Sequence, residues 1–256
     1  MKKNTQRGFT LVEMTIVLVI IGLILGAVTI GKDVQRNAEY TKVKQKFFDQ
    51  WVLAYNAYYQ RTGVVTGDNQ VAPQMMVNGA NFAVPSGGNM TTATPPAAIC
   101  RGAAGPNMAR AMQAAGTNDE FNLRTMMQRA GVRMPAGRAE GSEDRYVFLD
   151  SNGNPQEIQV CFQWNAPSTP SGAGNVMVIT GLTPDLARML DQMIDGKADA
   201  REGLFRQELV ANGTGNVPGV EWDVTNQHRY GETGTTPSNL DENQVATVIA
   251  HYKMNQ

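Results

Sequence analysis

The chain has 256 residues, a formal net charge of −1 at pH 7 and only 18% charged residues. This balance gives no electrostatic signature of nucleic-acid binding, because domains that bind nucleic acid concentrate Lys and Arg. The length is enough for one sizeable domain or two small ones. The 26 glycines and 12 prolines, with many Asn, Thr and Ala, favour a loop-rich exported domain containing β-structure over a cytosolic enzyme.

The N-terminus combines a basic head, residues 1–7, with a long apolar run from Met14 to Ile30. As a helix rising ~1.5 Å per residue, the segment Phe9–Gly31 is just long enough to cross the ~30 Å hydrocarbon core of a bilayer. Glu13 is the one carboxylate in this segment. A charge at membrane depth costs about 2.5 kcal/mol or more, so a partner for Glu13 is expected.

The motif Gly8-Phe9-Thr10-Leu11-Val12-Glu13 after a basic head resembles the class III signal of type IV pilins and of the pseudopilins of type II secretion. The resemblance implies cleavage between Gly8 and Phe9 by a prepilin peptidase on the cytoplasmic side. It also implies N-methylation of the new terminus at Phe9 and retention of the apolar helix. Glu13, fifth after the cut, matches the carboxylate that helps to align subunits in the filament core.

An ordinary secretory signal and a single-pass anchor share the basic head and the apolar run. The run is longer than a typical secretory core, and Glu13 has no place in one. Charge counting leaves the orientation open, because basic residues also flank the far end, from Lys32 to Lys46. The resemblance places the head in the cytoplasm, and the cysteine pair Cys100 and Cys161 agrees with an exported domain.

The helix is expected to continue past the membrane segment as far as Arg61. Residues 32–61 contain no proline, and Thr62-Gly63 supplies a stop. Apolar residues recur at helical spacing and predict a face that packs on a sheet; they are Tyr40, Val43, Phe47, Trp51, Ala54 or Tyr55, and Tyr58. Gly22 and Gly26 have the small-xxx-small spacing that lets membrane helices approach closely.

The stretch Val64–Met108 is rich in Asn, Gly, Pro and Thr, which predicts a long connection with possible β-segments at Gln74–Val77 and Ala80–Val84. Thr117-Asn118-Asp119-Glu120 has the form of a capping box. It predicts a short helix containing Phe121, Leu123, Met127 and Ala130, which Gly131 closes.

The best β-signal is a hairpin, with strands at 145–150 and 156–164 around Asn152-Gly153. Alternation puts Ile158, Val160 and Phe162 on one face and Cys161 on the other. Cys161 either forms a disulfide with Cys100 or is an inert thiol, and an exported domain favours the disulfide. Asp150, Asn152, Asn154 and Glu157 loosely resemble a calcium loop, but a plain hairpin turn explains them better.

A further strand is predicted at Val176–Ile179, followed by a helix that starts at Thr183-Pro184-Asp185 and ends at Gly196. Its inner face contains Leu186, Met189, Leu190 and Met193. The block from Leu190 to Gly203 resembles a helix exit of larger pilin-like proteins and leads to a strand at Leu204–Val210. Asp191, Asp195 and Asp199 are weak calcium candidates, and solvated acids at a helix exit are the simpler interpretation.

The tail, 245–254, fits a helix by spacing and a strand by composition, and we favour a strand. An enzyme is not expected. His228 and His251 have no catalytic or metal-ligand spacing, and no nucleophile, phosphate-loop or dinucleotide motif occurs. No cofactor is predicted, apart from the weak calcium candidates.

The sequence therefore predicts an α+β fold, in which a long N-terminal helical spine packs on an antiparallel sheet with short extra helices. We assign residues 1–8 to a cleaved leader, 9–31 to the transmembrane and filament-core helix, 32–62 to its amphipathic continuation and 63–256 to an exported globular domain.

The resemblance implies a structural subunit, a minor or large pilin of a type IV pilus-like filament. It would wait in the inner membrane with its N-terminus cytoplasmic and then enter a periplasmic or cell-surface filament. Implied partners are copies of itself, other pilin-like subunits, prepilin peptidase, an inner-membrane assembly platform and the membrane, without nucleic acid. The alternatives are a pseudopilin of type II secretion and a membrane-anchored periplasmic binding module that does not polymerise.

Overall fold

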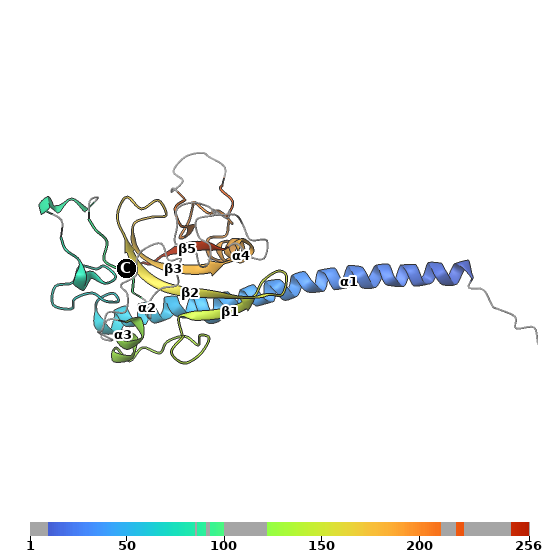
Figure 1. Ribbon diagram of the computed structural model, residues 1–256, viewed down its shortest axis with the longest axis horizontal. Helices are drawn as coiled ribbons and strands as arrows, with labels where there is room; N and C mark the ends of the chain where they lie inside the picture. The colour runs from blue at the N-terminus through green and yellow to red at the C-terminus, as the bar shows by residue number, and fades with distance from the viewer. Residues whose placement is uncertain are drawn as a thin grey trace, which may run out of the picture. The chain divides into compact units, whose positions relative to one another are not determined.

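The computed structural model describes residues 10–84, 86–90, 93–99, 122–210, 219–222 and 247–255. The chain divides into two compact units, Met1–Glu39 and Tyr40–Gln256. The predicted α+β class is confirmed: a long N-terminal helix precedes a five-stranded antiparallel sheet and short helices (Figure 1).

The N-terminal helix consists of α1 (Leu11–Val43), a π-helical segment η1 (Lys44–Phe48) and α2 (Asp49–Thr62). The prediction of one helix ending near Arg61 is confirmed, while Phe9 lies outside the described residues. The helix ends because Gly63 takes a left-handed conformation, with φ 75°, and its N–H donates to the Tyr59 carbonyl.

The predicted aromatic face of this helix packs on the sheet. Trp51 and Tyr55 are buried, and their ring centroids lie 6.1 and 4.9 Å from that of Phe162. The sequence pattern singled out Phe47 alone, whereas Phe47 and Phe48 are both buried. The π-helical segment contains an additional residue per turn, so two consecutive rings face the sheet.

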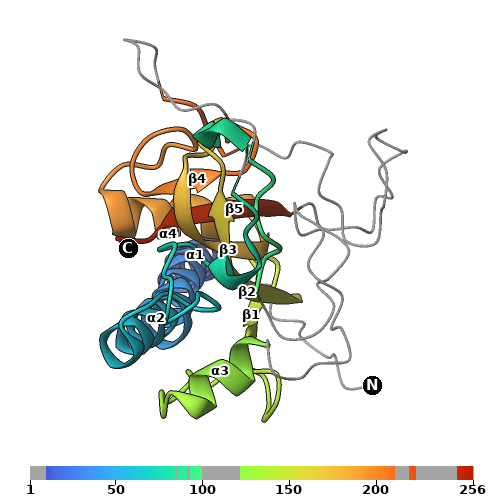
Figure 2. The same ribbon diagram turned by 90° about the vertical axis from the view of Figure 1, so that its left-hand side faces the viewer.

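The sheet has the order β1-β2-β3-β5-β4 (Figure 2). Its strands are β1 (Arg145–Leu149), β2 (Pro155–Asn165), β3 (Gly174–Leu182), β4 (Phe205–Gln207) and β5 (Val248–Lys253). The predicted hairpin, the strand around 176–179 and the C-terminal strand are confirmed.

The two faces of the sheet separate as the alternation predicted. Ile158, Val160 and Phe162 belong to the main core that α2 and α4 (Pro184–Asp195) cover. Cys161 lies in a second, smaller buried cluster on the other face, with Ala98, Val176, Val178 and Ile249. The hairpin turn is a plain turn, because the Asp150 Oδ1 accepts the N–H groups of Asn152 and Asn154.

Helix α4 matches its sequence signals closely. The Thr183 hydroxyl accepts from the Leu186 N–H, Pro184 is the first helical residue, and Gly196 ends the helix with φ 79°. Leu186 and Leu190 are fully buried, as the predicted inner face requires.

Three local predictions differ from the structure. Gln74–Val77 and Ala80–Val84 are not strands; the backbone turns there through the short helix η2 (Gly79–Asn81), and the Asn78 N–H donates to the Thr66 carbonyl at 2.9 Å. Another single turn, η3, spans Ser86–Gly88. Instead of Leu204–Val210, strand β4 covers only Phe205–Gln207, because Leu209 takes a φ of 62° that no strand continues through.

Helix α3 (Leu123–Arg129) is capped by Asn122, whose side chain accepts from the Thr125 N–H. Leu123 and Met127 are buried as predicted. The residues of the predicted capping box, 117–120, and Phe121 lie outside the described residues. The cap residue of α3 is Asn122 and not the predicted Thr117, because Asn and Thr are both favoured cap residues and the sequence alone does not separate them.

Candidate functional site

Glu13 and Thr10 form a reciprocal cap at the start of α1. Glu13 Oε2 accepts the Thr10 N–H at 2.8 Å and the Thr10 hydroxyl at 2.9 Å. In return, Thr10 Oγ1 accepts the Glu13 N–H at 3.2 Å. This is the Ser/Thr-x-x-Glu capping box, in which the cap residue and the third helical residue satisfy each other's exposed N–H groups. Sequence reasoning missed it, although the spacing Thr10-Leu11-Val12-Glu13 was visible.

The cap gives Glu13 hydrogen-bond donors from its own chain in an otherwise apolar segment. A carboxylate near a helix N-terminus is also stabilised by the helix dipole. Gly8 and Phe9 lie outside the described residues, so the structure places neither beside Glu13. Cleavage between them would put a new amino terminus at Phe9, the residue immediately before Thr10.

The surface of α1 around this cap is apolar and uncovered. Leu11 is 81% exposed and Leu23 is 70% exposed, and no residue from Thr10 to Gln35 is buried. The hydroxyls of Thr15 and Thr29 donate to the carbonyls of Val12 and Gly26 at 2.8 and 2.9 Å. Their polar groups are therefore satisfied within the helix, as a hydrocarbon environment demands.

Among the described residues, the helix Leu11–Thr62 is long and apolar enough to cross a membrane. Added Cβ atoms at Gly22 or Gly26 would meet nothing within 4 Å, so no packing against the described part of the chain requires these glycines. A surface of this kind is unfavourable in water and is suited to lipid or to neighbouring helices.

The sequence profile of the prokaryotic N-terminal methylation motif matches residues 3–29. The chain carries the prepilin-type signal of type IV pilins and pseudopilins. The match includes Gly8, Phe9 and Glu13 together with the apolar half of α1. Neither a curated protein nor a solved structure gives a significant match to the chain.

Of the two cysteines, Cys161 belongs to the described residues. Cys161 is buried and disulfide-bonded, whereas Cys100, the other cysteine of the sequence, lies outside the described residues. Ile99, next to Cys100 in sequence, forms an antiparallel bridge with Phe162, next to Cys161. The bridge supports the predicted Cys100–Cys161 pairing, which stays a prediction.

The three candidate calcium ligands hold loops through hydrogen bonds, and the interpretation as solvated acids is wrong for Asp191 and Asp199, which are buried. Asp191 Oδ2 accepts from the Asp199 N–H at 2.6 Å and from the Trp222 indole N–H at 2.8 Å. Asp195 Oδ2 accepts the N–H groups of Leu204 and Phe205, both at 2.9 Å. Within the described ranges, no group of three or more His, Cys, Asp or Glu side chains has a metal-binding arrangement. The candidate functional site is the prepilin segment, which the profile of the N-terminal methylation motif matches.

Proposed function

We propose that this protein is a filament subunit of the type IV pilus class, a minor or large pilin that prepilin peptidase processes. The N-terminal methylation motif supports a pilin-like or pseudopilin subunit in general. The observation that carries the proposal is the uncovered apolar helix with a single capped carboxylate near its start. Such a helix is stable in a membrane before assembly, and in a filament its lipid contacts can be replaced by contacts with the helices of other subunits.

In this proposal the leader is removed after Gly8, the Phe9 amine is methylated and the helix anchors the subunit in the inner membrane. The globular domain then lies outside the cytoplasm. An assembly platform moves the subunit into a periplasmic or surface filament. In the filament core, Glu13 pairs with the amino terminus of a neighbouring subunit. A carboxylate buried without such a partner would cost several kcal/mol, so the pairing favours one axial register.

The pair Glu13→Leu and Glu13→Gln tests this role. Leucine removes both the cap and the charge. Glutamine keeps an acceptor for the capping box and removes only the charge. Both variants are expected to insert into the membrane and be cleaved, and both should reduce the yield of sheared filaments roughly tenfold or more.

A normal filament yield from Glu13→Gln would show that capping, and not charge pairing, is the role of Glu13. The mass of the purified wild-type protein tests the rest of the proposal. We expect loss of residues 1–8 and one added methyl group. Retention of residues 1–8 would instead indicate a membrane-anchored module that does not polymerise. A protein that is processed but found only in a short periplasmic structure required for secretion would be a pseudopilin.

A further inference from the structure

The two oxygens of the Glu13 carboxylate have different surroundings. Oε2 accepts two hydrogen bonds from Thr10, one from its backbone N–H and one from its hydroxyl. Within the part of the chain that the structure describes, Oε1 accepts no hydrogen bond and forms no ion pair. The side chain is exposed, so Oε1 is accessible from outside the helix. One oxygen is therefore bound in the cap, and the other is available to a partner.

The Thr10 hydroxyl makes two of the three hydrogen bonds of this cap. Its oxygen accepts the Glu13 N–H at 3.2 Å, and its proton is donated to Glu13 Oε2 at 2.9 Å. A hydroxyl has one proton and two lone pairs, so it can make both bonds at once. A free glutamate side chain samples several staggered rotamers. The hydroxyl therefore helps to keep the Glu13 side chain in one orientation.

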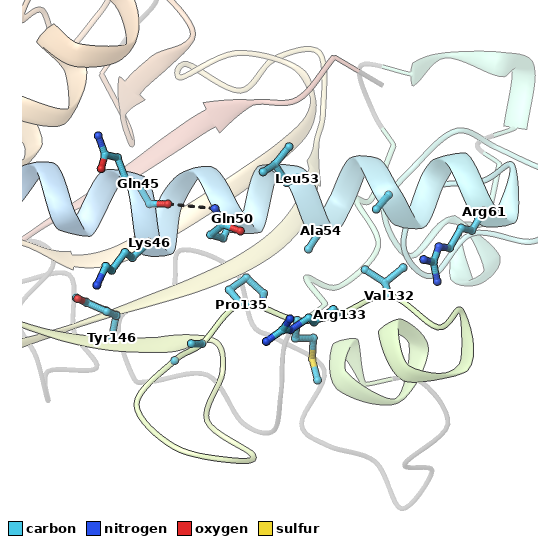
Figure 3. A pocket seen from close by; sticks show the side chains of 14 residues that line it. Gln45, Lys46, Gln50, Leu53, Ala54, Arg61, Val132, Arg133, Pro135 and Tyr146 are labelled. Atoms are coloured by element: carbon cyan, nitrogen blue, oxygen red, sulfur yellow. Dashed lines mark hydrogen bonds between the residues drawn. The ribbon is translucent and has the colours of Figure 1, made fainter.

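No Lys or Arg of α1 can reach Oε1. The first cation after Glu13 in the sequence is Lys32, which lies about 28 Å further along the helix axis at ~1.5 Å per residue. Lys46, which lines a groove along α2, follows later still in the sequence (Figure 3). An ionised carboxylate has about four acceptor sites on its two oxygens. A cation from outside this helix can therefore bind Oε1 while Thr10 stays bound to Oε2.

We propose that Thr10 is a positioning residue for filament assembly. It holds Glu13 through Oε2 and leaves Oε1 to accept from the amino terminus of a neighbouring subunit. Ordering a flexible side chain during association has an entropic cost, and the cap reduces it because the side chain is ordered beforehand. This inference rests on the proposed function and deepens it, since it assigns separate partners to the two oxygens and a role to Thr10.

Three substitutions in the full-length chain separate positioning of Glu13 from simple capping of the helix. Thr10→Ser keeps the hydroxyl and both of its bonds. Thr10→Asn keeps a strong cap residue, whose side-chain oxygen accepts the Glu13 N–H, but the hydroxyl that donates to Oε2 is lost. Thr10→Val keeps the shape of the side chain and removes both bonds. The measurement is the yield of sheared filaments per processed subunit, with loss of residues 1–8 verified by mass.

We expect Thr10→Ser to assemble like the wild type. Thr10→Asn and Thr10→Val should each reduce the yield about two- to tenfold, the range that corresponds to leaving one flexible side chain unordered before binding. If capping of the helix were the whole role of Thr10, Thr10→Asn would assemble normally. Wild-type yield from Thr10→Asn would therefore overturn the inference, and so would a reduced yield from Thr10→Ser.

Thr29→Val is the matched control on the same helix. This substitution also removes a threonine hydroxyl, but that hydroxyl donates to the Gly26 carbonyl at 2.9 Å and does not contact Glu13. Its filament yield should be unchanged. A loss as large as that of Thr10→Val would show that any threonine hydroxyl of α1 matters equally, which contradicts a specific role of Thr10.

Failure of the inference can be told apart from failure of the proposed function. If the processed wild-type chain forms no filament, the proposed function is wrong, and the positioning role is wrong with it. If wild-type filaments form and Thr10→Asn gives the same yield, the proposed function is unaffected and only the role of Thr10 is wrong.

Discussion

Asp191 shows how one buried side chain holds a connection in place. It is fully buried on α4, and its Oδ2 accepts from the backbone of Asp199 and from the indole of Trp222. Burial raises the pKa of Asp191 to about 7, although these two hydrogen bonds act in the opposite direction. The side chain therefore connects α4 to two later segments of the chain, one at Asp199 and one at Trp222.

The raised pKa of Asp191 predicts a dependence of stability on pH. Between the ordinary value of 3.8 and about 7, the folded chain holds a proton on Asp191 that the unfolded chain has lost. The free energy of unfolding should therefore fall as the pH rises through this window, by at most about 1.4 kcal/mol per pH unit from this group. Asp191→Asn should remove that component, because an amide does not titrate. The amide oxygen still accepts both hydrogen bonds, so the contacts of this side chain are kept.

The measurement is urea unfolding of the full chain in detergent, followed by tryptophan fluorescence at pH values from 4 to 8. The informative quantity is the difference between wild type and variant at each pH, because other groups titrate in both proteins. A difference that does not change with pH would contradict the raised pKa.

The capping box at Thr10 and Glu13 is another case at the residue scale. Both residues belong to the motif Gly8–Glu13, and the resemblance assigns a role to Glu13 alone. Within a single chain, Glu13 already accepts two hydrogen bonds from Thr10, without any contact from a neighbouring subunit. A charge in an apolar helix can therefore have a local partner as well as a distant one.

At the scale of elements, the helices and strands follow their local signals wherever those signals are strong. The Thr183-Pro184 start of α4 and the Asn152-Gly153 hairpin both lie where capping and turn chemistry place them. The π-helical segment was not predictable, because nothing in Lys44–Phe48 distinguishes it from ordinary helix. It is stabilised by contacts that Phe48 makes with Phe205 and Tyr252, far away in sequence.

Strand β3 contains an irregularity that glycine makes possible. Its pairing with β5 shifts register between Ile179 and Leu182, and Gly181 there has φ 77°. A Cβ at this position would collide with the carbonyl oxygen of Glu157 on β2. Glycine is therefore required twice, for the left-handed backbone and for the close approach of a neighbouring strand.

We predict that Gly181→Ala lowers the free energy of unfolding by about 2–4 kcal/mol, from backbone strain together with the collision. Gly153→Ala is the matched control. Gly153 has φ 85° in the hairpin turn, but a Cβ there would meet nothing within 4 Å. Its loss should be about 1–2 kcal/mol, from strain alone. Equal losses in chemical unfolding would show that β2 moves away at little cost.

At the scale of the whole molecule, the fold has two surfaces that need different environments. Among the described residues, none covers the apolar part of α1, whereas the globular unit buries its own core between α2, α4 and the sheet. The second face of the sheet, around Cys161, is also buried. The bridge from Ile99 to Phe162 places the connection that follows α2 beside β2, and Ala98 of this connection belongs to the buried cluster around Cys161.

A Cys100–Cys161 disulfide would close a loop of about sixty residues. The chain-entropy model assigns such a cross-link about 4 kcal/mol. We therefore expect the variant with serine at both positions to lose roughly this much stability, in the same unfolding assay under non-reducing conditions. Wild-type protein treated with dithiothreitol is the control and should behave like the variant. Alkylation of Cys161 in the untreated protein would contradict the pairing.

The sequence by itself determined the processing motif, the length of the N-terminal helix, its aromatic face and the hairpin. These features depend on residues that are near each other in the chain, where spacing and turn chemistry decide the conformation. Only the tertiary structure decided that Gln74–Val77 is not a strand and that a π-helical segment, Lys44–Phe48, separates α1 from α2. Those outcomes depend on which distant segments supply hydrogen bonds and packing, and no local pattern contains that information.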